Sequence, residues 1–411
     1  MHKSYSSYSI IGGVITATGL RIQCKKAPMI FLHSSFRTSS TWLWDKFRSQ
    51  GDLLSYYEVF NEKLATISAE DAKTSSYLDW NSKHHPTAPY FLEYLPLIQE
   101  NGGVDRYRPE IAYACYIPQD GPQGDITEME RHYLNRLVEH AEQLGKRPVL
   151  SCTRSIGRIA GIRRAFPGVH ILIYRNMFHQ WCSYTDQNIN QNPGFLDSIR
   201  YTLTLNKKDE LISEICRRYS IEENEQDTTK LFIAFILIHL YFYANCANHI
   251  DILVDVNRLS SEPGYREIIE GEIRDKCGPT LDLSDVRQSL GATFTLFGSR
   301  KETEDLLEPW VTQIVAAAPS EVGRYLAIKA YMDFLDEYER YFFYAGPVLN
   351  AWKPVLNAWE TGKALQEEEH RKVRDEYEAV VDERNRMRNS LSWRATAPFR
   401  RLGALLPSRR L

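Results

Sequence analysis

Two stretches of the chain alternate apolar and polar positions in a way that predicts a strand followed by a helix. Residues 30–32 are apolar, residues 33–41 contain mainly hydroxyls and one arginine, and apolar positions at helical spacing resume at Trp42. This pattern predicts a strand, a loop and a helix within residues 29–48. Later, residues 170–174 have the composition of a buried strand, and a turn and a new helix follow before residue 184.

The same alternation extends over residues 28–345 and predicts the fold class. Short strands are expected at 149–152 and 250–255, and an amphipathic helix at 156–166, which Pro167 and the following glycine end. A turn at 260–263 should precede another helix. Alternating strands and helices favour an α/β fold with a mostly parallel central sheet flanked by helices. Between residues 61 and 143, a segment rich in Pro, Tyr and His is interpreted as an insertion that covers a ligand site.

Two apolar segments have features of membrane or targeting signals. Residues 231–243 are shorter than the ~20 residues that span a bilayer, so we expect a buried core helix with His239 as a hydrogen-bonded core histidine. Residues 9–20 follow only one lysine and have no clear cleavage site, which favours an N-terminal arm or strand over residues 1–27.

The C-terminal residues 346–411 differ from the rest of the chain in charge and in the pattern of apolar positions. Residues 346–388 combine dense mixed charge with a thin apolar stripe, which predicts a long solvated helix or a short coiled coil and leaves a homodimer open. Residues 389–411 carry five arginines and no acid, interleaved with aromatic and leucine residues. That makeup is typical of a segment on an anionic membrane surface, and a tail packed on the domain of residues 28–345 is the alternative.

The polar residues after the two strands suggest anion binding. Ser39, Ser40 and Thr41 would stand at a helix N-terminus, where backbone N–H groups attract anions, and Arg37 adds a cation. An ordinary N-cap is the alternative explanation for these hydroxyls. Arg175 ends the later strand and precedes Ser183 in the next helix. Because ligands of parallel sheets bind beyond the carboxyl ends of strands, both groups are expected at one edge.

These residues resemble two motifs of the sulfotransferases that use 3′-phosphoadenosine-5′-phosphosulfate (PAPS). The family's first motif, Arg/Lys-Ser-Gly-Thr-Thr-Trp after a strand, resembles Arg37-Thr38-Ser39-Ser40-Thr41-Trp42, and its second, Arg-Asn/Asp with a serine seven residues beyond, resembles Arg175 to Ser183. The resemblance implies a P-loop-like sulfotransferase fold. It also implies that the first loop binds the 5′-phosphosulfate and the second the 3′-phosphate. Ser39 departs from the family, which has a glycine there that permits positive φ.

Sulfuryl transfer also needs a base for the acceptor hydroxyl. The resemblance to glycan-directed members favours Glu58, while a surface or helix-capping role stays open for it. Glu62 and the pair His84 and His85 are the alternatives as base or acceptor-binding residues. Arg154 stands where cytosolic members have a Lys-Thr-His signature, and is expected either to contact sulfate or acceptor or to form a surface ion pair. A late basic turn at Arg300 and Lys301 resembles the family's loop that reaches the 3′-phosphate.

Composition limits the classes of partner and cofactor that we expect. The 411 residues carry a net charge of −3, so no nucleic-acid partner is expected. Seven dispersed cysteines suit a reducing compartment, and no metal-ligand cluster is apparent, so no metal is expected. The Ser-Trp-Arg-x-Thr-x-Pro ending resembles tails of bacterial polysaccharide-building enzymes. We therefore expect a cytoplasmic PAPS-dependent sulfotransferase, peripheral on the inner membrane face, with a carbohydrate or glycolipid acceptor. A nucleotide-dependent kinase and a non-catalytic scaffold are the alternatives.

Overall fold

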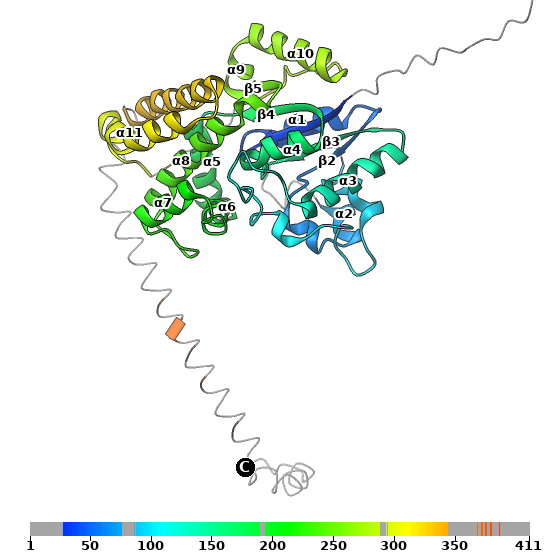
Figure 1. Ribbon diagram of the computed structural model, residues 1–411, viewed down its shortest axis with the longest axis horizontal. Coiled ribbons are helices and arrows are strands. Elements are labelled where there is room, and N and C mark those ends of the chain that lie inside the picture. The colour runs from blue at the N-terminus through cyan, green and yellow to red at the C-terminus, as the bar shows by residue number, and fades with distance from the viewer. Residues whose placement is uncertain are drawn as a thin grey trace, which may run out of the picture. The chain divides into compact units, whose positions relative to one another are not determined.

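A computed structural model describes residues 28–75, 86, 88–189, 194–287, 293 and 295–343, and the isolated positions 368, 371, 372, 375, 379 and 386 (Figure 1). The chain divides into two compact units, Met1–Glu339 and Arg340–Leu411. The six isolated positions of the second unit are helical. The predicted N-terminal arm and the basic tail of residues 389–411 lie outside the described residues.

The first unit is built on a parallel sheet, which confirms the predicted α/β fold. Its five strands stand in the order β2-β3-β1-β4-β5, and every neighbouring pair is parallel (Figure 1). The strands are β1 Met29–Ser34, β2 Leu53–Tyr56, β3 Arg147–Cys152, β4 Gly168–Tyr174 and β5 Ile252–Asp255.

Helices connect the strands and cover the sheet. The α-helices are α1 Ser40–Arg48, α2 Ala69–Thr74, α3 Glu128–Gln143, α4 Ile159–Ala165, α5 Met177–Ile189, α6 Gly194–Thr204, α7 Glu210–Tyr219, α8 Thr228–Cys246, α9 Val256–Ser261, α10 Pro263–Cys277 and α11 Arg300–Ala317. Short 3-10 turns are η1 Glu62–Ala65, η3 Leu92–Leu97, η4 Pro109–Ile111, η5 Ile156–Arg158 and η6 Ala247–His249. Residues 321–339 are also helical.

Several predicted boundaries change in the structure. The helix expected at 156–166 is split into η5 and α4, because its first turn is a 3-10 turn. The turn expected at 260–263 is the junction at which α9 ends and α10 begins, with a proline at the first position of α10. Strand β2 and helix α3 were not predicted. A capping box of Thr127 and Glu130 starts α3.

The connections place a topological switch beside β1. The chain moves from β1 to β2 in one direction across the sheet, and from β3 to β4 in the other. Right-handed crossovers then require α1 and α4 to lie on opposite faces. Two side chains of β1 identify the face that α4 covers. Phe31 and His33 line a small cavity together with Leu134 of α3 and Ile162 of α4, so α3 and α4 lie on the same face of the sheet. The loops that leave β1 and β3 therefore flank the crevice where α/β proteins bind ligands.

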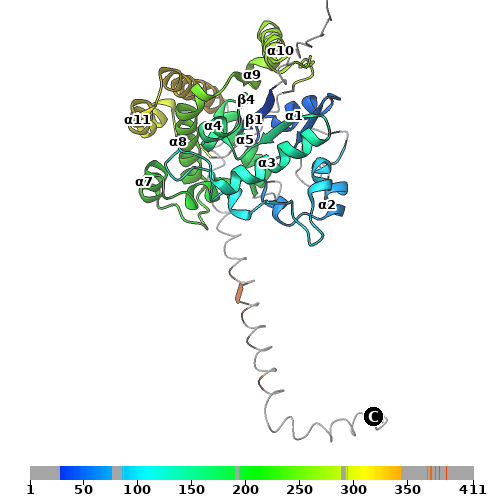
Figure 2. The same ribbon diagram turned by 45° about the vertical axis from the view of Figure 1, so that its right-hand side comes forward.

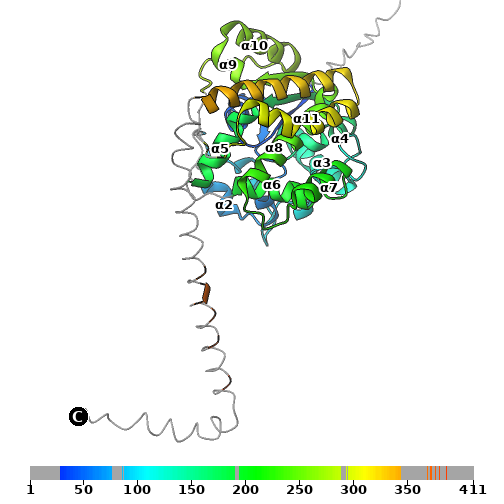
Figure 3. The same cartoon turned by 90° about the vertical axis from the view of Figure 1, so that its left-hand side faces the viewer.

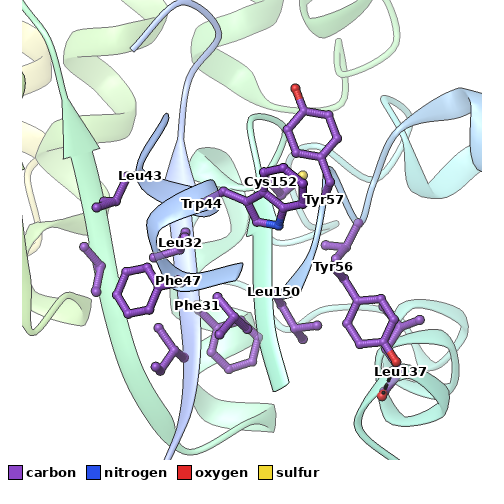
Figure 4. Packing of buried hydrophobic residues seen from close by; sticks show 14 of the residues in the cluster. Phe31, Leu32, Leu43, Trp44, Phe47, Tyr56, Tyr57, Leu137, Leu150 and Cys152 are labelled. Carbon is purple, nitrogen blue, oxygen red and sulfur yellow. Dashed lines mark hydrogen bonds between the residues drawn. The ribbon is translucent and has the colours of Figure 1, made fainter. Parts of the chain in front are cut away.

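Two apolar layers hold the sheet in place. Trp44 and Phe47 of α1 are fully buried against the strands (Figure 4). Helix α8 is buried along most of its length, as predicted, and α11 packs along it (Figure 3). The stretch Thr228–His249 is long and apolar enough to cross a membrane by length and composition, and most of it is buried inside the protein.

The segment of residues 321–339 is fastened to the ends of two strands. The Tyr174 hydroxyl donates to the Asp333 carboxylate at 2.9 Å, and the Asn176 side-chain amide donates to the Asp333 backbone carbonyl at 2.6 Å. Lys329 forms ion pairs with Asp255 at the end of β5 and with Asp333. Helices α9 and α10 follow β5 at that edge of the sheet (Figure 2).

Candidate functional site

The loop after β1 has the backbone geometry of a glycine loop, although it contains no glycine. Arg37 and Ser39 have positive φ values of 62° and 64°. Ser39, which stands where the motif it resembles has a glycine, is in the left-handed region. A side chain in that region costs roughly 1–2 kcal/mol. The serine thus adopts the conformation that glycine favours, and the departure from the motif leaves the turn intact.

The start of α1 is open to an anion. Ser39 is the N-cap residue, but its side chain makes no cap hydrogen bond. The first backbone bond of the helix runs from Leu43 N to Ser39 O at 3.3 Å. Within the described residues, no side-chain cap satisfies the N–H groups of the first turn, so the ordinary N-cap interpretation of these hydroxyls is wrong. Uncapped N–H groups and the helix dipole favour a negative ligand.

The two arginine segments, 138 residues apart in sequence, are in direct contact. The Arg37 Nε donates to Ser183 Oγ on α5 at 2.8 Å. The Arg175 Nη1 donates to the backbone carbonyl of Arg37, also at 2.8 Å. Strands β1 and β4 are neighbours, so their carboxyl ends bring the two segments together. The arginines and Ser183 form one cluster rather than two separated pockets.

Burial lowers the pKa of both arginines in this cluster. Arg175 is 5% exposed, and burial followed by the charge of Arg37 lowers its pKa to about 10. Burial also lowers the pKa of Arg37, whose guanidinium lies 5.1 Å from the centre of the Phe195 ring. The Arg37 Nε donates to a neutral hydroxyl. Two neighbouring, partly desolvated cations would be stabilised by a phosphate or sulfate group.

Other side chains of the loop support it from behind. The Thr38 hydroxyl is buried and donates to Ser35 O at 2.9 Å, so it is used within the turn rather than offered to a ligand. His239 Nδ1 lies 2.7 Å from Phe235 O and therefore carries the proton of the neutral ring. Its Nε2 then accepts from Ser35 Oγ at 2.6 Å. The predicted core histidine is hydrogen-bonded as expected, and it anchors the loop.

Trp42 faces the protein rather than open space. Its ring is 7% exposed, and its Nε1 donates to Asp285 at 3.0 Å. Lys46 forms an ion pair with the same carboxylate at 2.8 Å. The segment around Asp285 therefore covers this side of α1, and the indole N–H is already used.

Glu58 is a buried carboxylate at the end of β2. It has φ 48° and is 4% exposed, so the surface and helix-cap interpretations are both wrong. Its Oε2 accepts from Thr153 N at 3.2 Å, Thr153 Oγ1 at 2.6 Å and Arg154 Nη1 at 3.1 Å. Burial raises its pKa, against the opposing effects of Arg154 and Thr153. Its Oε1 accepts no hydrogen bond from the described residues.

Arg154 joins two carboxylates. Its Nη1 bonds Glu58, and its Nη2 bonds Glu62 at 2.6 Å. The Arg154 side chain is only 3% exposed, so the expected ion pair at the surface has a buried arginine. The Glu62 side chain, which is 54% exposed, is the partner that reaches solvent. The guanidinium also lies over the rings of Phe36 and Tyr113, at 4.8 and 5.1 Å. Glu58 and its sequence alternative Glu62 therefore belong to one cluster, open to solvent at Glu62.

The late basic pair stands at the start of α11. Arg300 is the first residue of α11 rather than part of a loop, and it forms ion pairs with Glu304, Asp336 and Glu339. Lys301 is paired with Asp305 and exposed. These carboxylates already pair both side chains, and reach to the 3′-phosphate stays a prediction. His84 and His85 lie outside the described residues.

Tyr57 is the residue that the sequence analysis missed. Its hydroxyl lies 3.0 Å from Thr41 Oγ1, between the start of α1 and the Glu58 strand end. Its place immediately before Glu58 was the available signal. In the described ranges, no group of three or more His, Cys, Asp or Glu side chains is placed to hold a metal ion.

No protein-family model, curated protein or solved structure matches this chain.

Proposed function

We propose that the protein is a sulfotransferase that transfers the sulfuryl group of PAPS to a hydroxyl group. The observation that carries the proposal is the joining of the two motif segments, in which Arg37 bonds Ser183 and Arg175 bonds the Arg37 carbonyl. The sequence places these residues far apart, and a ligand with phosphates at both ends would need them together. An uncapped helix start and a buried carboxylate lie at the same edge of the sheet.

The residues divide into two donor-binding groups. The uncapped N–H groups of α1, the Thr41 hydroxyl and Arg37 suit the 5′-phosphosulfate. Arg175 and Ser183 suit the 3′-phosphate. Because the Arg37 guanidinium donates to the neutral Ser183 hydroxyl, an arriving phosphate would replace that acceptor with a charged one and add the attraction between opposite charges.

Glu58 is the proposed base. Its pKa is raised by burial, so it binds a proton more readily than an exposed carboxylate. Thr153 and Arg154 hold Oε2, which fixes the carboxylate and leaves Oε1 to receive the acceptor proton. The preorganised cations and N–H groups would meanwhile stabilise the charge on the leaving phosphate.

Binding of the desulfated donor, 3′-phosphoadenosine-5′-phosphate, tests the proposal without a known acceptor. We expect this nucleotide to raise the melting temperature, because a ligand at a hundred times its dissociation constant adds about 2.7 kcal/mol to stability. Arg175→Ala should abolish most of the shift, whereas Arg164→Ala, which removes an exposed ion pair with Asp125, should not. A shift with ATP and Mg²⁺ but none with this nucleotide would contradict the proposal and favour the kinase.

The acceptor and location remain further proposals. A carbohydrate or glycolipid acceptor, and contact with the inner face of an anionic membrane, rest on the tail resemblance of residues 389–411. Mass spectrometry of surface glycans from cells with the native protein and with Arg175→Ala would test the acceptor class. Loss of a sulfated glycan only in the variant is the expected result, and identical glycans would contradict it.

A further inference from the structure

The Tyr57 ring packs near α1 and directly follows the end of β2. It stacks on Tyr90 with ring centroids 4.7 Å apart. Its centroid lies at the same distance from that of Trp44 on α1, and Figure 4 labels Tyr57 and Trp44. The Tyr94 hydroxyl donates to the Tyr57 backbone carbonyl at 2.9 Å. Tyr57 is 8% exposed, so packing fixes the direction of its hydroxyl.

That hydroxyl forms a pair with Thr41 at the start of α1. The two oxygens are 3.0 Å apart, and either one can be the donor. The pair holds two hydroxyl protons, but only one can lie between the oxygens. In the described part of the chain, neither hydroxyl has another hydrogen-bond partner. One proton is therefore left over and can be donated to a ligand, and Thr41, which carries it in one of the two arrangements, belongs to the uncapped first turn of α1.

We propose that Tyr57 is a positioning residue of the donor site, which orients the Thr41 hydroxyl so that this pair gives its second proton to the 5′-phosphosulfate. The inference rests on the proposed function and names a residue that the motifs do not contain. Burial and the neighbouring Glu58 raise the pKa of Tyr57, so its proton is retained at neutral pH. If Tyr57 donates to Thr41 and Thr41 donates to an anion, each hydrogen bond polarises the other, which strengthens both.

The inference predicts selectivity for one end of the nucleotide. Calorimetry would compare 3′-phosphoadenosine-5′-phosphate with adenosine 3′-phosphate, which lacks the 5′ group. Tyr57→Phe should weaken the first ligand about fivefold, the size of one ordinary hydrogen bond, and change the second less than about twofold. Thr41→Ala should have the same selectivity, and adding Tyr57→Phe to it should cause no further loss.

Tyr94→Phe is the matched control. It removes a hydroxyl that bonds the Tyr57 backbone, so it should lower the melting temperature without changing the ratio of the two affinities. The inference is overturned if Tyr57→Phe weakens both ligands equally, if it behaves as Tyr94→Phe does, or if its effect adds fully to that of Thr41→Ala. If the native protein binds neither nucleotide, the proposed function fails, and this inference fails with it.

Discussion

Three buried histidines should make folding sensitive to acid. His33 Nε2 lies 3.0 Å from His170 Nδ1, and His239 forms a hydrogen bond with Ser35 in the loop after β1. Burial lowers the pKa of all three, to about 4 for His170 and His239. In the unfolded chain a histidine titrates near pH 6.5. The unfolded state therefore binds more protons between pH 6.5 and 4, and stability falls as the pH falls through this window.

The size of the effect follows from the two pKa values. At pH 5, a histidine with a pKa of about 4 when folded and 6.5 when unfolded contributes about 2 kcal/mol less than at pH 8. His170 and His239 together should then remove about 4 kcal/mol, and His33 acts in the same direction. Such a loss is a large fraction of the 5–15 kcal/mol typical of folded proteins.

Urea unfolding at pH 8 and pH 5 measures this difference for the native protein and for variants. His239→Gln should lower stability at pH 8 but reduce the loss between the two pH values by about 2 kcal/mol. His132→Gln, at a histidine whose side chain is 67% exposed, is the control for the loss of an imidazole at the surface. If His239→Gln keeps the full acid loss, the histidine is not held neutral and the reasoning is refuted.

Three further changes test other parts of the structure. Ser39→Gly should raise the free energy of unfolding by about 1 kcal/mol, because it removes the cost of a left-handed side chain; unchanged urea unfolding would contradict this. Glu130→Gln should cost about 3 kcal/mol, because it leaves Arg158 buried without its carboxylate, whereas Glu128→Gln at the surface should cost little in the same assay. Glu58→Gln should retain binding of the desulfated nucleotide and lower transfer from PAPS about a hundredfold or more in a sulfate-transfer assay, and full turnover would exclude it as the base.

The fold was predictable where local patterns are strong. The apolar runs of β1, β3, β4 and β5 identify buried strands, and the composition of α8 identifies a core helix. Strand β2 has only four residues and pairs on one side with β3, so its existence depends on a distant partner. Helix α3 carries mixed charge along an exposed face, which made it look like part of an insertion. Such elements are decided by tertiary contacts rather than by local sequence.

The site was predictable only in its motif residues. Arg37, Arg175 and Ser183 follow strands, so their shared edge follows from the parallel sheet. Their direct bonds do not, because side-chain directions depend on the packed loops. The partners of Glu58 lie 95 and 96 residues away, and spacing gives no indication of them. Spacing also gave no indication of the partners of Arg300. This residue begins α11 and forms ion pairs with acidic side chains.

The bonds from Asp333 and Lys329 to the ends of β4 and β5 set a limit on truncation. Asn176, the neighbour of Arg175, depends on the Asp333 carbonyl, and Asp255 depends on Lys329. A fragment that stops after α11 would keep every residue of both motifs but leave these polar groups without their partners. The smallest expressible fragment with an intact arginine cluster should therefore extend to about residue 339, well beyond the last strand.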